Sequence, residues 1–84
     1  MKEAKLTTQS TKILKLLKTE GKEMNLSQVS SSTKIDRRLA MINLNDLEHG
    51  GYVTSDFKQE IIGDRKFITR YFSTTEKGLT YPTD

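Results

Sequence analysis

The feature that most constrains the fold is Gly63-Asp64, which lies between two stretches rich in β-branched and aromatic residues. A Gly-X pair in this setting favours a two-residue type II′ turn, so the flanking strands should pair as a β-hairpin. If Ile62 pairs with Arg65, alternate residues of both strands share one face. The apolar residues on that face are Val53, Phe57, Ile61, Ile68 and Phe72. We therefore expect this face to cover the core.

The residues before the hairpin repeat apolar side chains at helical spacing. A first helix is expected at about 8–20, where Ile13, Leu14 and Leu17 lie on one face and lysines on the other. Gly21 follows where a left-handed residue would end it. A second helix is expected at about 26–32, because Asn25 and Gln28 have the spacing of a capping box.

A third helix is expected at about 37–49, after Asp36 as its N-cap. Its inner face is predicted to hold Ala40, Leu44 and Leu47. The helix should stop at the two glycines at 50 and 51, and the hairpin should occupy about 52–74. A short helical turn can follow before Pro82, which prevents a long one. The expected architecture is one α+β domain over residues 1–84, with three helices, a two-stranded hairpin and a short C-terminal turn.

Composition narrows the classes of function. The net charge of +3 lies wholly in residues 1–23, which carry six lysines against three glutamates, while the rest of the chain is neutral. A basic excess favours a polyanionic partner. The chain has no cysteine and no apolar run long enough to span a membrane, so we expect a cytoplasmic protein, associated with the nucleoid in a prokaryotic host.

Catalytic and metal sites have little support in the sequence. His49 is the only histidine, so a histidine-rich metal site is excluded and a catalytic triad would depend on that residue alone. The glycine pair at 50 and 51 lacks the context of a phosphate-binding loop. We expect neither an enzyme nor a cofactor-binding protein, and no pocket for a small-molecule effector is evident.

Two stretches resemble a known group of proteins. The segment from Leu26 to Val53, with its apolar and polar positions in register, is similar to the helix-turn-helix signature of MarR, PadR and ArsR-type regulators, and residues 70–78 (RYFSTTEKG) resemble the segment that closes their wing. The resemblance implies a winged helix-turn-helix fold and sequence-specific binding of double-stranded DNA in transcriptional regulation. Lys34 stands where these proteins often have a glycine, and a left-handed backbone would cost a lysine about 1 kcal/mol there.

The resemblance also implies which residues touch DNA. It places the third helix in the major groove and the wing on the flanking minor groove or backbone. Arginines in the first turn of the third helix suit this role, because arginine can pair bidentately with guanine. Apart from the resemblance, Ser27 and the free N–H groups at the start of the second helix can hold a phosphate, and capping of that helix alone is the open alternative. The candidate DNA-binding residues are Ser27, Lys34, Arg37, Arg38, Met41, Asn45, Arg65 and Lys66.

A second function stays open at this point. Met41 and Ile42 place apolar side chains in the middle of the third helix, and such a surface can contact thymine methyl groups or another protein. The alternative is therefore a winged helix that docks proteins in a larger complex. A homodimer is also open, through the first helix, the tail or exposed apolar residues such as Ile62 and Phe67.

Overall fold

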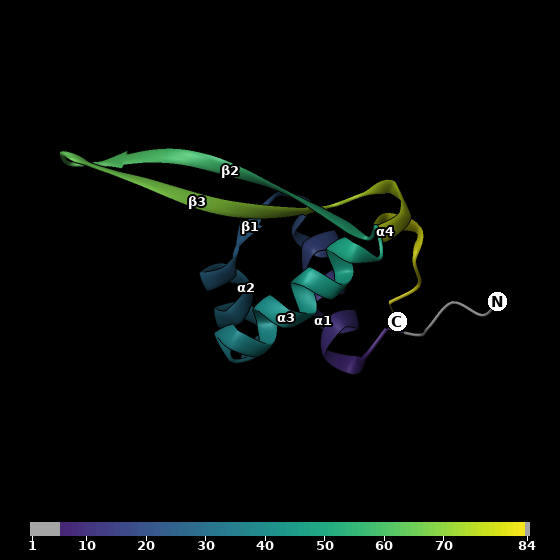
Figure 1. Cartoon of the computed structure of the whole chain (residues 1–84). Coiled ribbons are helices and arrows are strands. Elements are labelled where there is room, and N and C mark those ends of the chain that lie inside the picture. Colours follow the sequence, from purple (N-terminus) through teal and green to yellow (C-terminus); the bar gives the residue numbers. More distant parts are fainter. Residues whose placement is uncertain (1–5, 84) are drawn as a thin grey trace.

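The computed structural model describes residues 6–83, and it has the expected α+β architecture (Figure 1). Three helices lie beneath one sheet, and the hairpin reaches well beyond them. Lys2, Glu3 and Lys5, which contribute to the N-terminal charge, lie outside the described residues. The elements are α1 (Thr8–Glu20), β1 (Met24–Asn25), α2 (Leu26–Thr33), α3 (Arg37–His49), β2 (Val53–Ile62), β3 (Arg65–Thr74) and α4 (Glu76–Thr80).

The helix boundaries are set by side chains that satisfy free backbone N–H groups. Asn25 and Gln28 form the predicted capping box, with two reciprocal hydrogen bonds of 2.9 Å. Asp36 caps α3 by accepting a hydrogen bond from the backbone N–H of Arg38 at 3.1 Å. Gly21 ends α1 with a φ of 65°, in the left-handed region that glycine adopts without strain.

The hairpin has the predicted register. Ile62 pairs with Arg65, and Gly63 has a φ of 66° at the first position of the turn, as a type II′ turn requires. A short pairing of β1 with β3 places Met24 opposite Phe72. The strand order is β1-β3-β2, so β3 lies in the middle of the sheet near the helices.

The core lies where the base of the wing meets the three helices. Val53 and Phe72 are buried there, together with Leu14, Leu44 and Leu47. The prediction that the whole hairpin face covers the core is wrong for its outer half. Phe57, Ile61 and Ile68 are exposed by 70%, 68% and 73%. The reason is length: a ten-residue strand extends about 33 Å, whereas a 13-residue helix extends about 20 Å.

The C-terminal segment returns to the helices and closes the core. Gly78 lies against the wing base so closely that a Cβ atom there would come within 2.0 Å of the carbonyl oxygen of Tyr52. Lys18 of α1 donates a hydrogen bond to the carbonyl of Tyr81 at 2.7 Å, and the Tyr81 ring meets that of Tyr52 edge to face. One lysine of the basic face of α1 therefore anchors the tail.

The turn between α2 and α3 keeps a left-handed residue although glycine is absent. Lys34 has a φ of 62° and is the one non-glycine residue with a positive φ among residues 6–83. The neighbouring side chains hold it in place: Thr33 donates to the carbonyl of Val29 at 2.7 Å, and Ser30 donates to that of Ile35 at 2.6 Å. The turn therefore keeps the helix-turn-helix geometry, although the left-handed backbone of Lys34 is energetically unfavourable for a lysine.

This cost predicts a stabilising substitution. Lys34→Gly should raise the free energy of unfolding by about 1 kcal/mol, because glycine adopts the left-handed conformation without steric strain. Chemical denaturation measures the change. Lys15→Gly is the matched control, since Lys15 is an exposed lysine inside α1 and glycine there should lower stability by about 1 kcal/mol. A loss of stability in Lys34→Gly would contradict the prediction.

Candidate nucleic-acid interface

The exposed surface of α3 is oriented by a polar cluster centred on the buried Asn43. Asn43 is 6% exposed and faces α1. Its Oδ1 accepts hydrogen bonds from the hydroxyls of Ser10 at 2.7 Å and Thr7 at 3.2 Å, and its Nδ2 donates to Gln9 Oε1 at 3.0 Å and to the Leu39 carbonyl at 2.8 Å. All four hydrogen-bonding positions of the amide are used. The cluster therefore fixes the rotation of α3 against α1.

A second cluster joins the end of α3 to the base of the wing. Arg70 of β3 forms an ion pair with Glu48 and donates to Ser55 Oγ at 3.0 Å. Ser55 donates to the other carboxylate oxygen of Glu48 at 2.7 Å. The Arg70 guanidinium also lies 4.8 Å from the centre of the Phe72 ring. These contacts set the position of the wing relative to α3.

Two of the predicted site residues meet at the start of the helices. A guanidinium nitrogen of Arg37 donates a hydrogen bond to Ser27 Oγ at 2.6 Å, and the two residues are ten positions apart in the sequence. Both side chains are exposed. The remaining guanidinium donors of Arg37 can still reach a ligand, because arginine has five N–H groups. This pair joins the first turn of α2 to the first turn of α3.

The other predicted residues of α3 and its preceding turn have different environments. Lys34, Arg38 and Asn45 are exposed. At 100° per residue, Arg38 and Asn45 lie within about 20° of each other around α3, on the side opposite the buried Ala40 and Leu44. Met41 is half-buried and packs against the core. The structure thus separates Met41 from the outward face of α3.

The apolar surface of α3 includes one residue that the sequence reasoning missed. Leu39 is 44% exposed and Ile42 is 50% exposed, three residues apart on the helix. Leu39 lies one residue before the inner position of Ala40, so a full helical projection would have placed it outside the core. The exposed apolar pair is therefore Leu39 and Ile42 rather than Met41 and Ile42.

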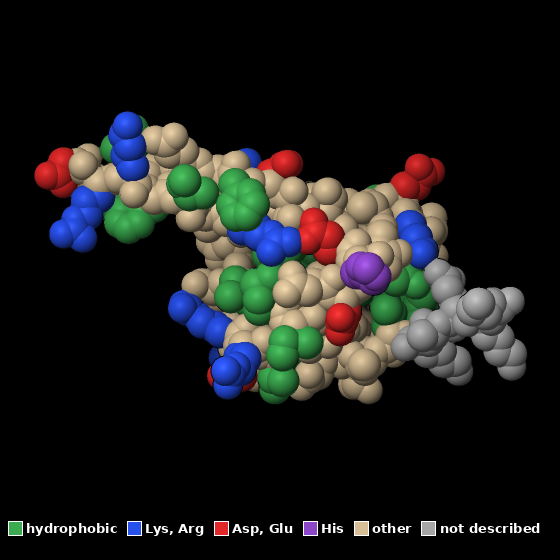
Figure 2. All heavy atoms as spheres, in the orientation of Figure 1, with side chains coloured by type: hydrophobic (Ala, Val, Ile, Leu, Met, Phe, Trp, Pro, Cys, Tyr) green, Lys and Arg blue, Asp and Glu red, His purple; other side chains and the backbone are tan. Residues whose placement is uncertain are grey.

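The wing tip places its basic residues away from the helices. Arg65 and Lys66 are exposed at the start of β3, and Ile62 and Phe67 nearby are exposed by 63% and 43%. Figure 2 shows Lys and Arg side chains both at the wing tip and at the edge of the helical body below it, on one face of the molecule. The basic side chains at the wing tip therefore lie apart from those on the helical body.

A cleft of about 370 Å³ lies between the wing, α2 and α3. Ser27 and Met41 line it on the helical side, and Ile68 and Arg70 line it on the wing side. It is open to solvent and carries both apolar and polar groups. The cleft thus extends from Ser27 to the underside of the wing.

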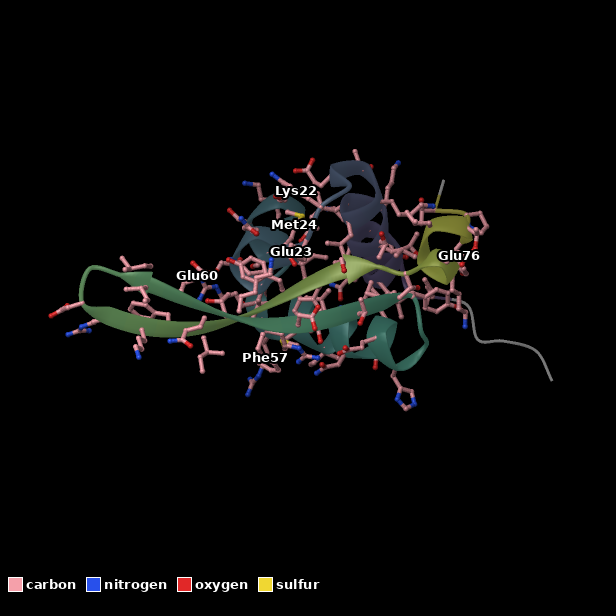
Figure 3. All side chains as sticks on the ribbon, turned by 90° about the horizontal axis from the view of Figure 1, so that it is seen from above. Lys22, Glu23, Met24, Phe57, Glu60 and Glu76 are labelled. Atoms are coloured by element: carbon pink, nitrogen blue, oxygen red, sulfur yellow. The ribbon has the colours of Figure 1, made fainter. Side chains whose placement is uncertain are left out.

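The far face of the hairpin carries a separate polar cluster. Tyr71 donates a hydrogen bond to Glu60, which raises the pKa of the Tyr71 hydroxyl above its ordinary value, with burial as a smaller cause. Lys58 forms an ion pair with Glu23. Seen from above, Phe57 and Glu60 lie on opposite sides of the hairpin (Figure 3). Among residues 6–83 no group of three or more acidic, histidine or cysteine side chains is arranged to hold a metal ion.

Comparison with solved structures identifies the architecture. A point mutant of ZitR from Lactococcus lactis is similar to this chain, with a TM-score of 0.70 and 22% identity over 94% of this chain. The chain has a winged-helix fold. Wild-type ZitR, solved in complex with DNA, gives a TM-score of 0.68 at 22% identity over 93% of this chain. The chain spans about half, 49%, of each ZitR chain.

The sequence comparisons add no family assignment. No protein-family model matches the chain, and no curated protein is significantly similar to it. None of the helices within residues 6–83 has the length and apolar character that crossing a bilayer demands.

The polar cluster around Asn43 predicts a selective loss of stability. Asn43→Ala should lower the free energy of unfolding by about 1–3 kcal/mol, because it leaves the buried Ser10 hydroxyl without its acceptor. Thermal and chemical denaturation measure the effect. Asn45→Ala, two residues along the same helix and exposed, should change stability by less than about 0.5 kcal/mol. Equal losses of unfolding free energy in the two variants would show that the hydrogen bonds of Asn43 do not contribute specifically to stability.

Proposed function

We propose that this protein binds double-stranded DNA in a sequence-specific way and regulates transcription. The observation that carries the proposal is the pair of exposed arginines in the first turn of α3, on a winged helix whose structural neighbour ZitR has been solved in complex with DNA. In this mode α3 enters the major groove, where the first turn of a recognition helix meets base edges.

The two arginines have different roles in this proposal. Arg38 lies on the outward side of α3 and reads a base, because its guanidinium can pair with O6 and N7 of guanine. Arg37 is tied to Ser27, so it contacts a backbone phosphate together with the Ser27 hydroxyl. Asn45 lies two turns further along the same side as Arg38 and extends the reading surface. Lys34 adds a phosphate contact from the turn.

The wing contributes contacts outside the major groove. Arg65 and Lys66 lie at its tip and are exposed, so they are free to meet the flanking backbone. Met41 lines the cleft between α3 and the wing, where it packs against the sugar-phosphate backbone rather than against a base. The apolar outward pair, Leu39 and Ile42, contacts thymine methyl groups.

The division between Arg37 and Arg38 gives the main test. Arg38→Ala should weaken binding to the preferred site by about 5- to 150-fold and leave non-specific binding nearly unchanged, since one base contact carries about 1–3 kcal/mol of discrimination. Arg37→Ala should weaken binding to all duplexes alike and reduce the log–log salt slope by about 1. A preferred site is first selected from random duplexes, and fluorescence anisotropy then measures both effects.

Lys15→Ala provides the matched control. It removes one positive charge from an exposed position on α1, so a general effect of net charge would weaken binding as much as Arg37→Ala does. The wild-type salt slope should be near −4 to −5 if about five phosphates are contacted. Failure of the wild-type protein to bind any mixed duplex at low salt would overturn the DNA-binding proposal.

A second candidate function is docking to a protein within a larger complex. The exposed Leu39 and Ile42 on α3 favour it, because apolar side chains at the centre of an exposed helix face are typical of protein interfaces. A substitution at Ile42 helps to distinguish the two functions. If the protein binds DNA through α3, Ile42→Ala should leave DNA affinity within about threefold, since a single methyl contact contributes little. Absence of binding to any duplex would leave docking as the candidate function.

A further inference from the structure

The outer half of the hairpin, where β2 forms a free edge, carries the most exposed apolar side chains among residues 6–83. Because the strand order is β1-β3-β2, one edge of β2 has no partner strand within residues 6–83. Ile62 and Arg65 are the hydrogen-bonded pair next to the turn, so every second residue of β2, counted back from Ile62, directs its backbone N–H and C=O groups toward β3. The backbone N–H and C=O groups of Phe57, Gln59 and Ile61 therefore point outward. A long free edge of this kind is a template for another strand.

The side chains along this edge are apolar on one face. Phe57 and Ile61 are exposed by 70% and 68%, and they lie on the same face as Ile68 of β3, which is exposed by 73%. In Figure 2 apolar side chains follow the wing outward from the helical body. An apolar row beside a free strand edge favours pairing that covers both at once.

The sequence of the edge is complementary to itself. Residues 57–61 read Phe-Lys-Gln-Glu-Ile, so a two-fold axis through Gln59 exchanges the basic residue with the acidic one and one apolar residue with the other. In antiparallel pairing about this axis, Lys58 lies opposite Glu60 of the second copy, and Phe57 lies opposite Ile61 of the second copy. Opposite charges and apolar pairs directly across a ladder are each stabilising.

Neighbouring registers lose this match. A two-fold axis through Lys58 places Lys58 against itself and Asp56 against Glu60 of the second copy, and an axis through Glu60 places Glu60 against itself. An axis through Phe57 pairs Asp56 with Lys58 of the second copy, but it also places Ile62 of the second copy opposite Tyr52, which is buried and cannot pair with another strand. Like charges directly opposite each other are destabilising, so of these registers only the one about Gln59 satisfies both charge and space.

We propose that the β2 edge binds a second copy of this chain, in antiparallel register about Gln59, and forms a continuous sheet across two wings. Lys58 and Glu60 already contact Glu23 and Tyr71 within one chain. The side chain of Lys58 keeps 51% of its surface exposed, so it can bridge Glu23 and the second copy together. This dimer does not depend on DNA, and its tests use the free protein.

Cysteine cross-linking tests the register directly. The chain has no cysteine, so Gln59→Cys introduces a single thiol at the two-fold axis, where paired Cα atoms lie about 5.5 Å apart. Mild oxidation should give a covalent dimer on a non-reducing gel. Ile68→Cys is the matched control, because the two β3 strands lie about 14 Å apart across the joined sheets, beyond disulfide reach. Equal cross-linking of both variants would overturn the proposal.

Charge reversal tests the pairing itself. Lys58→Glu should weaken dimerisation about tenfold, because it places a second carboxylate opposite Glu60 of the other copy, and adding Glu60→Lys should restore it. Sedimentation equilibrium up to about 1 mM measures the dissociation constant, since a small interface binds weakly. Circular dichroism verifies that each variant folds. A wild-type chain that stays monomeric throughout this range would refute the proposal.

Discussion

The fold depends on the burial of one side chain, Phe72, in the middle strand of the sheet. Phe72 is 1% exposed and pairs with Met24 on one side and Ser55 on the other. It therefore joins the segment before α2 to the hairpin that follows α3. The guanidinium of Arg70 lies over its ring and also binds Glu48 at the end of α3. Through this one position the helices and the wing become a single body.

The sequence predicts the local elements well because their signals are local. A capping residue, its partner three positions later and a glycine beyond the last turn all act within a few residues. The II′ turn fixes the register of the hairpin for the same reason, since two residues determine which strand positions meet. Asn25, Asp36 and Gly63 therefore behave in the structure as the sequence indicates.

The sequence does not predict how far the core extends. Alternation of apolar residues shows that Phe57, Ile61 and Ile68 share a face, but not that a helix lies under it. The helices are too short to cover the outer wing. The pairing of Arg37 with Ser27 is also hidden, because it joins two helix starts through a turn whose conformation depends on Lys34. Such contacts depend on tertiary geometry.

The two proposals use different parts of the same wing. DNA would meet the tip at Arg65 and Lys66, whereas a second copy would meet the free edge of β2.

Antiparallel pairing relates two copies by an axis normal to the sheet, so both helical bodies lie on the same side of it. Val53 is six residues from Gln59, which places the two wing bases about 40 Å apart at about 3.3 Å per residue. Successive major grooves on one side of DNA are about 34 Å apart. In a dimer joined in this way, the exposed length of the wing would set a spacing of the same order as one turn of the duplex.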